Sequence, residues 1–301
     1  MTDTEGLVVE SFGRRVRVRL ADGLVIPCNL RGRRLDVVVG DQVALTVGPD
    51  RSDGIVESRL PRRNVLARCD SRGLPESIAA NLDQLAVVVA PQPVCDPFIV
   101  DRYAAGAWLA DMVPLVIVNK CDLNAADSTL DFLPALERTG MQVIYVSAKR
   151  REGLATLVEA LRDRRTLFVG QSGVGKSSLL NALLGADTRT TRALSDSSGE
   201  GRHTSVSSAI FACPWGEIAD SPGVRDFAPA LASLPMLQHG FPEIAAVAER
   251  CRFQNCLHLR EPQCEVQAQV SDGLIDPRRH ESYRRLVNLT RQLIERRGPR
   301  A

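Results

Sequence analysis

Short apolar runs separated by turn residues make up the first 66 positions of the chain. Glycine, Asp-Gly and Gly-Pro positions interrupt segments of strand-like alternation, which are 7–11, 16–20, 24–30, 42–47 and 54–57. About five strands within about 60 residues predict a small closed barrel, and the OB-fold is the leading candidate because it is a common nucleic-acid-binding barrel of that size. An SH3-like barrel fits the same pattern and is the alternative.

Beyond residue 80 the pattern changes to apolar strands that alternate with helices. Runs rich in β-branched residues occupy 85–90, 115–118, 143–146 and 167–169, and helical periodicity occupies 98–109, 154–161 and 176–184. This alternation predicts a parallel sheet with helices on both faces. Two more strands are expected at 209–212 and 217–219.

The predicted elements divide the chain into three parts. The segment 67–80 contains Ser71, Gly73 and Pro75 and has the composition of a connector. Beyond about residue 232 the strands give way to helices around a cysteine-rich loop. We therefore expect a multidomain α/β protein with a barrel at 1–70, an α/β domain at 71–232 and a helical domain at 233–301.

The composition of the 301 residues is that of a globular protein. Hydrophobic residues make up 44% and charged residues 25%, and no apolar run approaches the roughly 18–20 residues of a membrane span. We expect a cytoplasmic protein without a membrane partner. Five of the eight cysteines are scattered singly, which favours a reduced compartment over a disulfide framework.

Both ends of the chain are basic. Residues 6–34 contain seven arginines and two acidic residues, and residues 272–301 contain eight arginines and four acidic residues. Arg15, Arg17 and Arg19 alternate with valines, so they are expected on one face of a strand. Such segments can bind a phosphate backbone, and a solvated arginine-rich surface is the alternative.

All three lysines of the chain, among 38 basic residues, lie in short segments typical of guanine-nucleotide sites. A compact ammonium and a planar guanidinium are not interchangeable where a site is narrow. Lys176 belongs to a phosphate-loop pattern between a predicted strand and a predicted helix. Its ammonium would reach the terminal phosphates as a catalytic group, and the Ser177 hydroxyl would bind Mg²⁺. The residues expected to contact GTP in this loop are Gly170, Gln171, Ser172, Gly173, Val174, Gly175, Lys176, Ser177 and Ser178.

Two further motifs follow predicted strands and would select guanine. The Asp122 carboxylate can accept hydrogen bonds from N1–H and the 2-amino group, donors that adenine does not offer in that arrangement. A backbone N–H in Ser147-Ala148-Lys149 would meet the guanine O6. In ordinary GTPases the phosphate loop comes first, so the order found here indicates a circular permutation. The residues assigned to the base are Asn119, Lys120, Asp122, Ser147, Ala148 and Lys149.

A third group of residues would complete the magnesium site. In the motif that follows the last predicted strand, Asp220 would hold Mg²⁺ through water, and the Gly223 N–H would meet the γ-phosphate. A polar glycine-rich stretch precedes it, in which either Thr204 or Ser205 would supply a hydroxyl to Mg²⁺. His203 could orient the attacking water, and a surface-loop histidine is the alternative.

Four metal-ligand side chains lie close together near the C-terminus. Cys251, Cys256, His258 and Cys264 have the spacing C-x4-C-x-H-x5-C, which suits a tetrahedral Cys3His zinc site. Protein fills all four positions, so one structural rather than catalytic Zn²⁺ is expected. The metal would stabilise a region that has too few apolar residues to fold alone.

The barrel, the permuted GTPase motifs and this cysteine spacing together resemble the ribosome small-subunit-dependent GTPase A family (RsgA, also called YjeQ). The resemblance implies a circularly permuted P-loop GTPase domain between an N-terminal OB-fold and a C-terminal helical zinc-binding domain. It also implies a late-acting assembly factor that binds the 30S subunit and its 16S rRNA, hydrolyses GTP to GDP when the subunit stimulates it, and then leaves. His203 matches the family's proposed catalytic histidine.

Two other functions are compatible with the residues. One is a permuted GTPase that acts on the large subunit. The other is an RNA-binding protein with GTP as a structural ligand, because Val224 stands where Ras-like enzymes carry a water-positioning glutamine. In each case we expect a monomer. Because the chain runs directly from Asp220 into the C-terminal segment, that domain is expected to respond to loss of the γ-phosphate.

Overall fold

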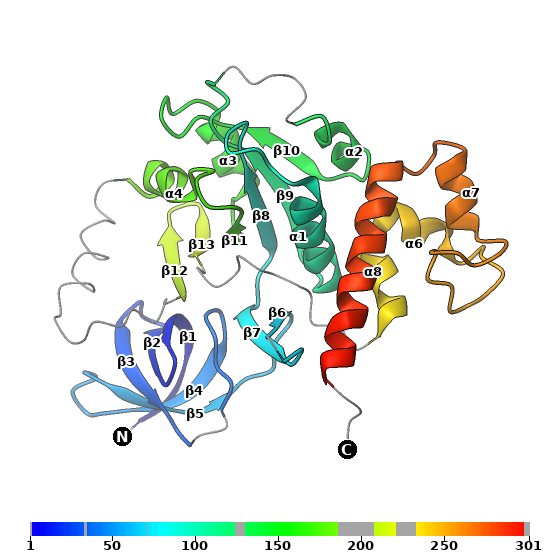
Figure 1. Ribbon diagram of the computed structural model, residues 1–301. Coiled ribbons are helices and arrows are strands. Elements are labelled where there is room, and N and C mark those ends of the chain that lie inside the picture. The colour runs from blue at the N-terminus through cyan, green and yellow to red at the C-terminus, as the bar shows by residue number, and fades with distance from the viewer. Residues whose placement is uncertain are drawn as a thin grey trace.

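The computed structural model describes residues 2–32, 35–70, 72–123, 130–185, 208–220 and 233–297. In this part of the chain an 11-stranded sheet extends from the N-terminal barrel through the central domain. The C-terminal helices lie beside the central domain, on the side away from the barrel strands (Figure 1). No helix among these residues is long and apolar enough to cross a membrane.

The N-terminal strands form a closed barrel. They pair in the order β1-β2-β3-β5-β4, and β4 pairs again with β1. Val8, Val18 and Val43 belong to the apolar core that fills the interior. The predicted five-stranded barrel is confirmed, with the strand order of an OB-fold. The strands are β1 (Thr2–Phe12), β2 (Arg15–Leu20), β3 (Val25–Leu30), β4 (Gln42–Val47) and β5 (Gly54–Arg59).

The central domain is built on parallel strands. Their order is β10-β9-β8-β11-β13-β12, with all neighbours parallel except β12, which is antiparallel to β13. This arrangement confirms the predicted parallel sheet. The strands are β8 (Gln84–Val89), β9 (Val113–Val118), β10 (Gln142–Tyr145), β11 (Arg165–Val169), β12 (Ser208–Cys213) and β13 (Gly216–Asp220).

Helices cover both faces of this sheet, as the periodicity predicted. Because successive strand residues point to opposite faces, Val87 and Val89 of β8 pack with α1 and α2, whereas Ala86 and Val88 pack with α3 and α4. The helices are α1 (Pro97–Leu109), α2 (Leu133–Glu137), α3 (Leu154–Ala160) and α4 (Lys176–Leu184).

The segment expected to be a connector is part of a β-hairpin, formed by β6 (Val65–Cys69) and β7 (Pro75–Ala80). The Asp70 carboxylate accepts hydrogen bonds from the backbone N–H groups of Arg72 and Leu74 and so builds the turn. Leu66 and Ile78 are buried in the core that also contains α1. A two-stranded hairpin is marginal by itself, and this one is stabilised by packing that the local sequence does not reveal.

The described C-terminal part consists of helices around a non-helical loop that carries the cysteines, as expected. Its elements are η3 (Leu234–Gly240), α6 (Pro242–Ala248), α7 (Glu265–Ser271) and α8 (Pro277–Arg297). In Figure 1 the long helix α8 lies beside α1. Phe241 and Tyr283 share an apolar core with Ala105 of α1, so the C-terminal helices rest directly on the central domain.

Hydrogen bonds and an ion-pair network join the barrel to the central domain. β1 pairs with β12 at Glu10 and Ser11, which makes the two sheets continuous. Arg19 of β2 contacts the Glu217 carboxylate of β13, and Arg165 of β11 lies 2.6 Å from the same carboxylate. Burial raises the pKa of Glu217, but the two guanidinium groups outweigh it and hold the pKa below its ordinary value.

A buried ion-pair network joins the C-terminal helices to the central domain. Arg279 of α8 is 1% exposed and lies 2.7 Å from Asp101 of α1 and 2.7 Å from Glu243 of α6. Arg278 pairs with the same Asp101 at 2.6 Å. Buried charges are tolerated only when they are paired, so this network requires the three elements to remain together.

Candidate functional site

The phosphate loop is the turn between β11 and α4. Gly170 has φ +142°, and a Cβ there would collide with the Val88 carbonyl oxygen of the neighbouring strand. Gly175 has φ +89° and precedes the first helical residue, and a Cβ there would collide with the Asn119 amide. Glycine is therefore required at both positions. The Lys176 ammonium donates to the carbonyl oxygens of Gly170 and Gln171, the latter at 2.8 Å, so it lies within the loop.

Asn119, in the motif after β9, forms hydrogen bonds with the phosphate loop and with the motif Ser147-Ala148-Lys149. Its side chain is 1% exposed and donates to the Val174 carbonyl oxygen at 3.0 Å. Its amide oxygen accepts from the Ala148 backbone N–H at 3.1 Å. The buried amide is thus hydrogen-bonded on both sides, and it holds together three motifs that are far apart in the sequence.

Lys120 makes a second connection to the phosphate loop. It has φ +61°, and its ammonium donates to the carbonyl oxygens of Gly173 at 2.7 Å and Gln92 at 2.8 Å. Gln92 belongs to the loop that follows β8, which the sequence did not single out. The loops that follow β8, β9 and β10 therefore form one hydrogen-bonded unit with the phosphate loop. This unit lies at the carboxyl edge of the sheet, where open α/β sheets bind ligands.

The Asp122 carboxylate is held in place by neighbouring side chains. The Ser147 hydroxyl donates to its carboxylate at 2.6 Å, and the Arg150 guanidinium lies 3.9 Å away. The hydrogen bond from Ser147 lowers the pKa of Asp122 below its ordinary value. The carboxylate is consequently ionised at neutral pH and can accept two hydrogen bonds from N1–H and the 2-amino group of guanine.

The predicted magnesium residues lie around the same edge, as far as they are described. Asp220 is the last residue of β13 and pairs with Phe168 of β11, two positions before the phosphate loop. Ser177 is the second residue of α4. The strand pairing therefore brings the carboxyl end of β13 beside the phosphate loop. His203, Thr204, Ser205 and Gly223 lie outside the described residues.

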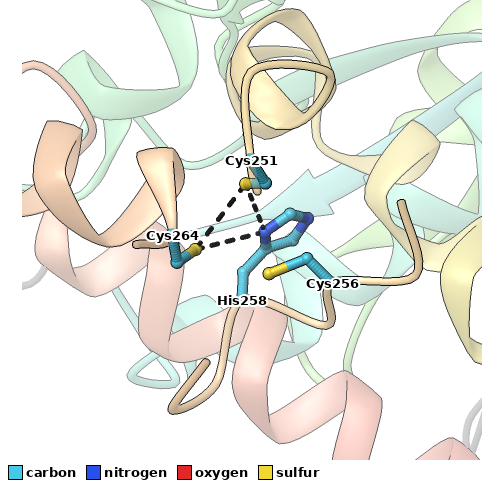
Figure 2. Close-up of side chains that lie close together, drawn as sticks. All are labelled: Cys251, Cys256, His258 and Cys264. Carbon is cyan, nitrogen blue, oxygen red and sulfur yellow. Dashed lines mark hydrogen bonds between the residues drawn. The ribbon is translucent and has the colours of Figure 1, made fainter. Parts of the chain in front are cut away.

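The four predicted zinc ligands converge on one point. Figure 2 shows the sulfur atoms of Cys251, Cys256 and Cys264 around the His258 ring, and the four ligand atoms lie within 4.8 Å of one another. The Cys251 and Cys264 sulfur atoms are 3.8 Å apart, and His258 Nδ1 lies 3.5 and 3.4 Å from them. A tetrahedral Zn²⁺ with Zn–S bonds of about 2.3 Å has S–S edges of about 3.8 Å, so the spacing fits the ion.

The chemistry of the donor set also fits a zinc ion. Burial raises the pKa of Cys256 to about 12, and a bound cation reverses that cost by stabilising the thiolate. Burial lowers the pKa of His258, so its imidazole is neutral at pH 7, as a metal ligand must be. Tyr283, buried against His258, has no hydrogen-bond partner for its hydroxyl among the residues that the structure describes.

Known proteins resemble this chain over most of its length. The family model described as RsgA GTPase matches residues 59–229. The small ribosomal subunit biogenesis GTPase RsgA of Bordetella pertussis is 40% identical over 288 residues, which cover 94% of this chain and 95% of that protein.

Two solved structures have the same architecture. YloQ, described as a circularly permuted GTPase, has a TM-score of 0.72 and 28% identity, covering 100% of this chain and 98% of its own. YjeQ from Thermotoga maritima also has a TM-score of 0.72 and 28% identity, covering 99% of this chain and 100% of its own. The order of motifs along the sequence had predicted such a permutation.

Proposed function

The chain belongs to the RsgA GTPase family, and from this premise we propose that it is a GTP-hydrolysing factor of small ribosomal subunit biogenesis that acts in the cytoplasm. The observation that carries the proposal is the hydrogen-bonded unit of Asn119, Lys120 and the phosphate loop, with Asp122 positioned for guanine. These contacts support specific binding of GTP and GDP.

Phosphoryl transfer to water is mainly a matter of positioning and charge stabilisation. We assign the backbone N–H groups of residues 170–178 and the Lys176 ammonium to the phosphates. Ser177, Asp220 and either Thr204 or Ser205 would hold Mg²⁺, which neutralises charge on the phosphate oxygens when it is bound. His203 would orient the attacking water, since no glutamine follows Gly223, and Gly223 would contact the γ-phosphate.

The barrel and the C-terminal domain would bind the protein to the 30S subunit. We assign contacts with 16S rRNA to Arg15 and Arg17 of β2, since Arg19 is paired with Glu217 at the junction, and to the basic C-terminal helix, because guanidinium groups neutralise phosphates. A single structural Zn²⁺ held by Cys251, Cys256, His258 and Cys264 would keep the C-terminal loop folded. Binding to the 30S subunit would stimulate GTP hydrolysis, and the GDP form would leave, with the protein acting as a monomer.

The test is GTP hydrolysis by the purified protein alone, with 30S subunits and with 50S subunits at matched salt. We expect 30S subunits to increase the rate of GTP hydrolysis and 50S subunits to leave it unchanged. His203→Ala should lower the stimulated rate at least about 100-fold, the usual contribution of a positioned acid–base group, with unchanged GDP affinity. Stimulation by 50S subunits would instead support the large-subunit alternative, and a rate indifferent to His203→Ala would support GTP as a structural ligand.

A further inference from the structure

The His258 ring has a hydrogen-bond partner on the side that faces away from the cysteines. Its Nδ1 lies 3.4 Å from the Cys264 sulfur, and its Nε2 lies 3.1 Å from the Gln238 side-chain oxygen. Gln238 precedes His258 by 20 residues and was not among the residues that the sequence singled out. We propose that Gln238 is a positioning residue for the zinc site and that it anchors η3 to the metal.

The first step of the argument concerns the tautomer of His258. An amide oxygen can only accept a hydrogen bond, so Nε2 must carry the proton. The lone pair of the neutral ring is then on Nδ1, which faces the sulfur atoms. Partners of this kind fix the orientation of a metal-ligating histidine and raise its basicity, and losing one typically weakens metal binding by about 10–100-fold.

The second step concerns the rigidity of the ring. His258 is 1% exposed and has φ +57°. Its carbonyl oxygen accepts a hydrogen bond from His280 Nε2 at 2.9 Å, and Tyr283 packs against the ring with centroids 5.9 Å apart. Other contacts already hold the His258 backbone and one face of the ring. The hydrogen bond with Gln238 therefore determines what is left, which is the tautomer and the orientation of the ring plane.

The third step concerns what Gln238 brings with it. Gln238 lies on η3, the first element after β13 in the described chain. Its neighbour Leu237 is fully buried, and Gly240 lies so close to Ala105 of α1 that a Cβ would be 2.9 Å from the Ala105 Cβ. The hydrogen bond therefore joins the metal loop to an element that packs on a helix of the GTPase domain.

The experiment compares two substitutions in the full chain. Gln238→Met keeps the length of the side chain and removes the acceptor, whereas Gln238→Glu keeps an acceptor. Competition with a chromophoric chelator should show zinc affinity about 10–100-fold lower in Gln238→Met, with Gln238→Glu close to the unchanged protein. Gln263→Met is the matched control, because the Gln263 side-chain oxygen accepts a hydrogen bond from Arg252 rather than from a zinc ligand.

Hydrogen exchange tests the connection to η3. Chelating the zinc should increase amide exchange in 234–240, and Gln238→Met should show that increase with zinc present while its GDP affinity remains unchanged. Three results would each overturn the inference. They are unchanged zinc affinity in Gln238→Met, equal losses of zinc affinity in Gln238→Met and Gln238→Glu, and amide exchange in 234–240 that does not respond to zinc removal. The inference rests on the proposed zinc ion; failure of the unsubstituted protein to bind zinc would refute that site itself, which is a distinguishable result.

Discussion

At the scale of single residues, the nucleotide site depends on side chains that each satisfy several groups at once. Asn119 donates to the phosphate loop and accepts from the loop that would hold the guanine O6. Asp122 is positioned by Ser147 through a 2.6 Å hydrogen bond. Because every partner is a fixed backbone or buried group, small changes of side-chain chemistry should change specificity without unfolding the domain.

Asp122→Asn should change the base preference. The amide would present one acceptor and one donor, whereas guanine requires two acceptors, so GTP affinity should fall about 10- to 150-fold as a charged hydrogen bond is lost. Xanthine has a carbonyl oxygen in place of the 2-amino group, so XTP should bind the variant better than GTP does. Fluorescent-nucleotide titration measures both, and retained preference for GTP would contradict the assigned role of Asp122.

At the scale of elements, the turn of the β6–β7 hairpin packs closely against the backbone of α8. Gly73 has φ +77°, and a Cβ there would collide with the Leu293 carbonyl oxygen of α8. Arg297 of the same helix donates to the Gly73 carbonyl oxygen at 2.6 Å. The hairpin that links the barrel to the central domain thus also contacts the last helix of the chain.

Gly73→Ala should separate the hairpin from α8. Two costs are expected, about 1–2 kcal/mol for a positive φ and about 1–3 kcal/mol for the forced contact. Gly13→Ala is the matched control, because Gly13 has φ +72° with nothing within 4 Å of its added Cβ. Thermal unfolding should show a larger drop in Tm for Gly73→Ala; equal drops would mean that the contact with α8 contributes nothing.

At the scale of the whole molecule, charged networks at both junctions join the three domains. Arg279 requires α1, α6 and α8 to remain together, and Glu217 holds Arg19 of the barrel beside Arg165 of the central sheet. β12, which pairs with the barrel strand β1, lies directly after the predicted magnesium and catalytic residues 203–205 in the sequence. The barrel as well as the C-terminal domain is therefore attached to a segment next to the nucleotide site.

The barrel junction should weaken at acidic pH. The Glu217 pKa lies below its ordinary value of 4.5 in the folded protein, so its stabilising contribution is present above that value and is lost as the pH falls through the folded pKa. Glu217→Gln should lower the Tm at pH 7, and the difference from the unsubstituted protein should shrink below pH 4.5. Scanning fluorimetry across pH 3.5–7 measures this, and a difference that does not change with pH would exclude the ionised carboxylate as its cause.

The sequence by itself determined the local chemistry and the class of fold. The phosphate-loop pattern, the motif that contains Asp122 and the Cys3His spacing each lie within at most 14 consecutive residues, so their spacing is visible without coordinates. Alternating apolar periods likewise predicted the barrel strands, the parallel sheet and helices close to the observed α1, α3 and α4. The order of the motifs predicted the circular permutation.

Only the tertiary structure decided how these parts are joined. Arg19 and Glu217 are 198 positions apart, Arg279 and Asp101 are 178 apart, and Gln238 and His258 are 20 apart with the helix α6 between them. The β6–β7 hairpin could not be predicted for the same reason. Its stability comes from packing against α1 and α8 and not from its own sequence pattern. Contacts between distant residues leave no local period, because only the folded backbone brings such side chains within reach of one another.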